Sequence, residues 1–162
     1  MKLLNKNSVL ISFVSIFFLI NCKEETPVTP DTRTKVQLMQ VGPWKWTAST
    51  CDTAIDIDGM NGASKDIHGQ YPICFKDDIY TFKADSTTSE AANTKCTTEG
   101  TYKGSWIFTN GEKNLRWTGK DFKTRKYALR DYTIIELTDS KMVLRYLEVA
   151  ANNYLITNTY TH

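Results

Sequence analysis

Hydrophobic and polar residues alternate along most of the chain, and turn residues interrupt the alternation about every ten positions. Because successive side chains of a β-strand point to opposite faces, this pattern predicts strands that are apolar on one face. Asn110-Gly111 is the strongest hairpin signal, and two more turns are expected at 119–121 and 138–140. A short helix is predicted from Val36 to Val41. The predicted strands lie near residues 44–51, 75–84, 87–96, 101–109, 113–119, 124–137, 141–149 and 153–161.

An antiparallel sheet with one apolar face must pack on a second sheet or close on itself. Eight consecutive strands favour closure, so the predicted fold is all-β: a small antiparallel up-and-down β-barrel. Such a barrel is either filled by its own side chains or holds one small ligand. The alternation also places Trp44 and Ala48 on the same face as Trp46. The residues expected to line a ligand cavity are Trp46, Tyr80, Phe82, Tyr102, Trp106, Trp117, Leu144 and Tyr146.

The N-terminus has the pattern of a removable secretory signal. Lys2 and Lys6 precede the apolar run 9–20, which is shorter than the roughly 20 residues that a membrane-spanning helix needs. The run ends in Leu19-Ile20-Asn21-Cys22, which resembles the lipobox of bacterial lipoproteins, with Asn21 in place of the usual small residue. By this resemblance Cys22 carries the lipid after cleavage, whereas an ordinary secreted protein or an uncleaved anchor helix would leave Cys22 unexplained.

The chain is therefore expected to comprise a signal peptide over 1–21, a flexible tether over 22–34 and a barrel domain over 35–162. Lys23-Glu24-Glu25 in the tether looks like the signal that sends some Bacteroidetes lipoproteins to the outer surface. We expect a protein anchored by lipid to the cell outer membrane, on its periplasmic or its surface side.

Charge narrows the range of partners. Of the 20 basic residues two precede Cys22, which leaves 18 against 18 acidic residues in the mature chain. A neutral domain lacks the basic surface expected of a nucleic-acid-binding protein. The expected partners are the membrane, through the lipid anchor, and a small hydrophobic ligand, and the protein is expected to be a monomer.

The start of the predicted barrel resembles that of lipocalins. Val41-Gly42-Pro43-Trp44, after a short helix, is similar to the Gly-x-Trp opening of that family. Residues 36–149 also resemble lipocalin-like lipoproteins of Bacteroidetes and other Gram-negative bacteria, which implies a small antiparallel barrel without known catalytic residues. The resemblance implies that Arg145 stacks on Trp44 in a cation–π contact; the alternative leaves Arg145 solvated on the outer face. The segments that carry this resemblance are 70–78, 80–85, 104–106 and 132–138.

Three cysteines follow Cys22, in a compartment that permits disulfides. Cys74 and Cys96 are equally distant from Asp85, which lies in a predicted turn, so they should be close across the strand pair. We favour a Cys74–Cys96 disulfide, which would stabilise the fold by roughly 3 kcal/mol. The alternatives are a bridge from Cys51 to either of them, or three free thiols.

Residues 56–66 partly match a calcium-binding loop. Asp56 and Asp58 fit the first and third ligand positions, Asn61 comes one residue late, and Asp66 is the nearest acid to the closing position. The alternative is a plain turn, because Asp, Asn and Gly form turns without a metal. Calcium is thus a candidate cofactor.

The sequence contains no motif of a familiar enzyme class: no Gly-x-Ser-x-Gly elbow, no HExxH and no CxxC occurs. His68 and His162 are the only histidines, so an activating base for a cysteine nucleophile is improbable. We expect a binding protein and not an enzyme. Its leading function is to bind a small apolar or amphipathic ligand; the rivals are a structural lipoprotein whose filled barrel binds protein or glycan at its rim, and a hydrolase.

Overall fold

The computed structural model describes residues 31–57, 59, 62–94, 96, 102–120, 127–149 and 153–162. Thr32–His162 form one compact unit. The predicted signal peptide, Cys22, most of the tether, Asp58 and Asn61 therefore lie outside the described residues. Within the described ranges, no helix has both the length and the apolar character needed to cross a bilayer.

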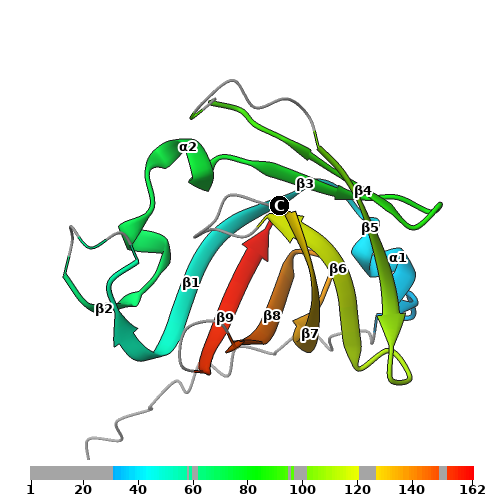
Figure 1. Cartoon of the computed structure of the whole chain (residues 1–162). Helices are drawn as coiled ribbons and strands as arrows, with labels where there is room; N and C mark the ends of the chain where they lie inside the picture. Colours follow the sequence, from blue (N-terminus) through cyan, green and yellow to red (C-terminus); the bar gives the residue numbers. More distant parts are fainter. Residues whose placement is uncertain are drawn as a thin grey trace, which may run out of the picture. The chain divides into compact units, whose positions relative to one another are not determined.

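Eight antiparallel strands close into a barrel, which confirms the predicted fold class (Figure 1). Each barrel strand pairs with its neighbour in the sequence, and pairing of the first strand with the last closes the barrel. The barrel strands are β1 Trp44–Ile55, β3 Ile79–Phe82, β4 Thr87–Ala91, β5 Tyr102–Thr109, β6 Asn114–Lys120, β7 Tyr127–Leu137, β8 Lys141–Glu148 and β9 Tyr154–Thr161. Helix α1, Lys35–Met39, lies where a helix was predicted and is capped by Thr34, whose hydroxyl accepts from the Gln37 amide.

Connections between consecutive antiparallel strands alternate between the two ends of the barrel. One end, the turn end, carries the short connections 83–86, 110–113 and 138–140 and the start of β1. At the other end, the loop end, lie the ends of β1, β4, β6 and β8 and the starts of β3, β5, β7 and β9.

Helix α1 covers the turn end. The Lys35 ammonium donates to the carbonyl of Glu112 in the β5–β6 turn, and Arg33 pairs with Asp139 in the β7–β8 turn at 3.2 Å. Met39 on α1 is buried in the barrel core. Lys35 and Met39 of α1, together with Arg33 just before the helix, thus cover this end of the barrel.

The inward faces follow the predicted alternation in β3, β5, β6 and β8, but β1 departs from it. The pairing of β1 with β9 shifts by one residue between Trp46 and Ala48. Trp46 is buried before the shift, and Ser49 and Cys51 are buried after it. The prediction that Ala48 shares the face of Trp46 is therefore wrong, because an extra residue reverses the faces of the strand from there on.

The predicted strand 75–84 is only half correct. Pro72, with φ −63°, begins a short helix α2, Ile73–Lys76, so that strand β3 starts only at Ile79. As a result β3 pairs with β1 at two positions alone, Trp44 with Tyr80 and Lys45 with Ile79. The predicted strand 87–96 is likewise shorter and ends at Ala91.

Farther along the same edge, β1 pairs with the short strand β2, Ser64–Asp66, and the 3₁₀ helix η1, His68–Gln70, follows. We call the space between β1 and β3 the seam. Ile67 and Phe75, which are 3% and 2% exposed, contribute buried side chains from the segment that fills this seam.

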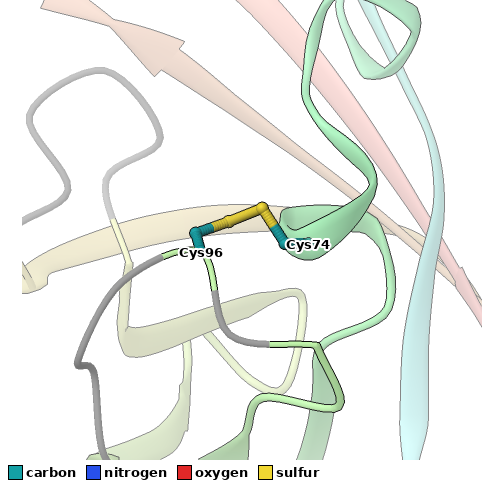
Figure 2. The surroundings of a disulfide bond; sticks show 2 residues. All are labelled: Cys74 and Cys96. Carbon is teal, nitrogen blue, oxygen red and sulfur yellow. A yellow bond between two sulfur atoms is a disulfide. The ribbon is translucent and has the colours of Figure 1, made fainter.

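The Cys74–Cys96 disulfide is present, with the two Cα atoms 5.2 Å apart, which confirms the predicted pairing (Figure 2). The β3–β4 register pairs Tyr80 with Glu90, so the hairpin is centred on Asp85 as predicted. The cysteines lie beyond the paired strands: Cys74 is on α2 and Cys96 follows β4 (Figure 2). The bridge therefore ties the seam segment to the connection after β4.

Candidate functional site

The barrel interior is lined by aromatic side chains that contact one another. Trp117 lies at the centre, and its ring centroid is 5.1 Å from Phe82, 5.4 Å from Tyr80 and 6.0 Å from Tyr160. Rings at these separations leave no gap between them, so they fill the middle of the barrel. Of the eight residues predicted to line a cavity, seven are buried in this core and Tyr102 is half-buried.

At the turn end, Trp44 of the Gly-x-Trp motif is held by contacts with α1 and with the C-terminal residue His162. Trp44 is fully buried and its indole donates to the Met39 carbonyl at 2.9 Å. The imidazole of His162 lies against the indole, with ring centroids 4.1 Å apart. A Cβ at Gly42 would lie 3.2 Å from His162 Nδ1, so the glycine of the Gly-x-Trp motif leaves room for this imidazole.

Arg145 does not stack on Trp44, which corrects one of the two expectations for it. Arg145 lies between the inward-facing Leu144 and Tyr146 on β8, so alternation turns it to the outer face. There its Nε donates to the Thr157 hydroxyl at 3.2 Å.

Phenol groups make the interior partly polar. Tyr80 and Tyr160 are 3% and 1% exposed, and their ring centroids are 5.7 Å apart. Burial raises the pKa of both phenols well above the usual value, and the carboxylate of Glu90 raises the pKa of Tyr80 further. Glu90 itself is only 6% exposed, since it faces inward opposite Tyr80. Hydroxyl and carboxyl groups thus lie inside the aromatic wall.

Toward the loop end the interior carries an ion pair. Arg130, which pairs across the sheet with the inward Trp117, contacts a Glu148 carboxylate oxygen at 2.9 Å. The Arg130 guanidinium also lies 5.1 Å from the centroid of the Tyr146 ring. Burial raises the pKa of Tyr146. Sequence reasoning missed this pair, although Arg130 and Glu148 lie in register with inward aromatic residues.

Two further polar residues face the interior where β1 pairs with β9. Ser49 and Asn158 are cross-strand partners, and they are 1% and 0% exposed. Among the described residues the Ser49 hydroxyl has no hydrogen-bond partner, whereas a hydrogen bond from the Asn158 side chain opposes the rise in the pKa of Tyr160 that burial causes. Leaving such a group unpaired costs about 1–3 kcal/mol. The signal in the sequence was a polar residue, Asn158, between Ile156 and Tyr160 on an alternating face.

A hollow lies between β3, β4, β5 and β6. It encloses about 160 Å³, counting the part open to solvent, but it is too narrow to admit a water molecule. Ligand pockets typically measure roughly 300–1,000 Å³, so this hollow is not by itself a ligand cavity. Its lining residues are Tyr80, Thr88, Ser89, Glu90, Tyr102, Trp117 and Thr118.

In the described part of the predicted calcium loop, side-chain carboxylates accept hydrogen bonds from backbone amides. The Asp56 carboxylate accepts from the amides of Gly59 at 2.8 Å and Gly62 at 3.2 Å, and Asp66 accepts from the Gly69 amide at 2.8 Å. Such contacts are typical of an Asx turn. Among the described residues, no three His, Cys, Asp or Glu side chains cluster as metal ligands would. Asp58 and Asn61, the other two predicted ligands, lie outside these residues.

Cys51 and His68 carry reactive groups near the interior. Cys51 is a free, buried thiol, and burial raises its pKa, so it is a poor nucleophile. His68 in η1 packs edge-on against Trp46, with centroids 4.6 Å apart. Burial is the main cause that lowers the pKa of His68, and Lys76 lowers it further.

Comparison with known proteins agrees with this architecture. Residues 41–144 match the family described as the lipocalin-like domain. No curated protein matches the chain. The matched segment starts just before Trp44 and ends at Leu144, so it includes β1 to β7 and the first half of β8.

Proposed function

We propose that the chain, which belongs to the lipocalin-like domain family, binds a small apolar or amphipathic ligand inside its barrel and is held at the outer membrane by a lipid on Cys22. Barrels of this family fit small-ligand binding and typically lack catalysis. The ligand would enter from the loop end and lie against the aromatic wall.

The difference between the two barrel ends carries this proposal. Helix α1, Trp44 and short turns close one end, whereas toward the other end the interior carries an ion pair. An amphipathic molecule entering there would place its apolar part on Tyr146 and its polar part beside Arg130 or Glu148. Such a combination of apolar surface and a few directed polar groups is what small-molecule sites share.

Ligand binding is tested by native mass spectrometry of the full chain, purified without denaturant from the cells that make it. The proposal predicts a mass excess of a few hundred daltons, typical of a drug-sized ligand, that is lost on denaturation. A bare protein mass, together with no saturable binding of the fluorescent apolar probe N-phenyl-1-naphthylamine, would contradict it.

The lipid anchor is supported by the resemblance of Leu19-Ile20-Asn21-Cys22 to a lipobox. Cys22→Ser removes the thiol that would receive the lipid, so the variant should leave the detergent phase in a phase separation of whole-cell protein. Cys51→Ser is the matched control, because Cys51 is buried inside the barrel and should not affect partitioning. Retention of Cys22→Ser in the detergent phase would rule out the anchor.

A filled structural barrel is the competing function. The close ring contacts of Trp117 and the narrow hollow beside Glu90 favour it. It predicts that no apolar probe binds the interior and that the rim, not the interior, contacts a partner. The two functions therefore differ in whether a probe reaches the interior from the loop end.

A further inference from the structure

Large apolar side chains are exposed to solvent at the loop end of the barrel. Four of them, Ile73, Leu129, Leu147 and Val149, are between 52% and 70% exposed. Ile73 lies on α2, Leu129 is near the start of β7, and the other two are at the end of β8 and just after it. Single exposed apolar residues are common on protein surfaces, but neighbouring ones mark a site of interaction.

Three of these side chains adjoin one another on the outer wall. The register of β7 with β8, continued toward the loop end, places Leu129 opposite Val149 and diagonal to Leu147. Leu147 in turn pairs with the half-buried Leu155 on β9. We call the surface formed by Leu129, Leu147, Val149 and Leu155 the rim patch. It extends over three strands and has no charged member.

The turn end presents charged groups instead. Arg33 pairs with Asp139 at 3.2 Å, and Lys141 pairs with Glu136 at 2.7 Å. Lys35 donates to a backbone carbonyl at the same end. Charged groups of this kind remain hydrated at low cost, whereas exposed leucine and valine side chains gain free energy by leaving water. Of the two ends, the loop end is therefore the one suited to an apolar partner.

The proposed lipid anchor brings the rim patch within reach of a bilayer. The chain advances twelve residues from Cys22 to Thr34, the N-cap of α1 at the turn end. A chain of this length spans at most about 40 Å when fully extended. The eight residues of β8 span only about 27 Å. The tether is thus long enough to pass along the barrel while the loop end contacts the membrane that holds the lipid.

The composition of the rim patch favours a bilayer over a second copy of the chain. Its four members are all aliphatic, whereas the centres of protein–protein interfaces are enriched in aromatic residues, Met and Arg. The absence of charge from the patch also means that its contact with lipid needs no anionic headgroup. A neutral phospholipid such as phosphatidylcholine is therefore sufficient.

We propose that the rim patch rests on the lipid bilayer, with Leu129, Leu147 and Val149 inserted at the boundary between headgroups and acyl chains. The loop end of the barrel then faces the membrane and the turn end faces the aqueous phase. This inference rests on the lipid anchor of the proposed function and adds the orientation in which the anchor holds the barrel. A second copy seated on the rim patch is the alternative occupant.

The test uses the full-length lipidated protein, reconstituted into phosphatidylcholine vesicles whose acyl chains either carry bromine or lack it. Bromine quenches tryptophan fluorescence on close contact, so Leu129→Trp and Leu147→Trp place a reporter in the rim patch. The matched controls are Ile107→Trp and Ile135→Trp, at exposed outward positions of β5 and β7 nearer the turn end. The wild type supplies the background, because its four tryptophans are at most 5% exposed: Trp44, Trp46, Trp106 and Trp117.

We expect brominated lipid to quench the added emission of Leu129→Trp and of Leu147→Trp at least twofold more than that of either control. Equal quenching at all four positions, or stronger quenching of the controls, would overturn the inference. A blue-shifted emission of Leu129→Trp that bromine does not quench would show that a second copy covers the patch, and would also overturn it. Flotation of the vesicles separates this result from the proposed anchor. Protein that floats without quenching at the rim patch leaves the anchor in place, whereas protein that does not float contradicts both.

Discussion

The guanidinium of Arg130 lies 5.1 Å from the centre of the Tyr146 ring and pairs with Glu148 at 2.9 Å, all three groups facing the barrel interior. The Arg130 and Glu148 side chains are only 15% and 22% exposed. Their attraction is therefore screened less than that of a surface pair. An arginine inside an aromatic wall needs this carboxylate, because an unpaired charge in such surroundings is strongly unfavourable.

The first prediction concerns this pair. Glu148→Gln keeps the shape but removes the charge partner of Arg130, so it should lower the free energy of unfolding by about 1–3 kcal/mol in urea. Asp131→Asn is the control, since it breaks the outer-face pair of Arg116 and Asp131, which are 48% and 53% exposed. That change should cost less than about 1 kcal/mol. Equal effects of the two variants would show that the Arg130–Glu148 pair is in effect solvated.

The second prediction concerns the disulfide. Cys74 and Cys96 close a loop with a sequence separation of 22 residues. Reduction, or Cys74→Ser with Cys96→Ser, should lower the free energy of unfolding by about 3 kcal/mol, because the unfolded chain gains freedom. Urea unfolding of oxidised and reduced wild type measures the difference. The Cys51→Ser variant should respond to reduction as the wild type does, because Cys51 is a free thiol.

Peptide mapping without reductant gives a separate check on the pairing. It should recover Cys74 joined to Cys96 and Cys51 unmodified. A peptide that contains Cys51 joined to either of the others would contradict the Cys74–Cys96 bridge and the free thiol of Cys51.

The third prediction concerns pH. The pKa of His68 in the folded protein lies below its usual value of about 6.5, because burial and the nearby Lys76 outweigh the opposing effects of a hydrogen bond with the Trp46 backbone and of Asp66. Between the two pKa values the unfolded chain binds more protons than the folded one, so stability should fall as pH falls below about 6.5. The loss should be complete once pH is below the folded pKa.

Urea midpoints between pH 7.5 and 5 test this, with His68→Gln as the comparison. The variant should lose the decline in this range and keep any decline at lower pH. Asp52 and Asp85, whose pKa values are lowered chiefly by hydrogen bonds from Leu155 and Thr87, titrate only in that lower range. The same decline in wild type and variant would exclude His68 as its cause.

The sequence was sufficient to predict the barrel because the alternation within each strand indicates which of its residues face inward. Alternation placed Tyr80, Phe82, Trp117 and Leu144 inward, and each is buried. The symmetry of Cys74 and Cys96 about Asp85 also predicted the disulfide, although both cysteines lie beyond the paired strands, in α2 and after β4.

The features that alternation could not predict are those where the strand is interrupted. The shift after Trp46 turns Ser49 inward, and the sequence has no signal that distinguishes it from a regular strand. Pro72 could have indicated that a strand does not begin at Phe75, since the short α2 follows it directly. Whether inward side chains fill a barrel or line a cavity depends on volumes in three dimensions, which a face pattern does not contain.

The most direct test of ligand binding in the barrel uses two adjacent residues of β7. Ala128 is half-buried on the inward face toward the loop end, opposite Gly119, whereas Leu129 is 61% exposed on the outer face. Titration with N-phenyl-1-naphthylamine, followed by quenching of tryptophan fluorescence, measures probe affinity in the wild type, Ala128→Trp and Leu129→Trp. If the ligand lies inside the barrel, the wild type binds saturably, Ala128→Trp weakens binding at least tenfold, and Leu129→Trp leaves it unchanged. Equal affinity in both variants, or no saturable binding in the wild type, would contradict a ligand site in the interior.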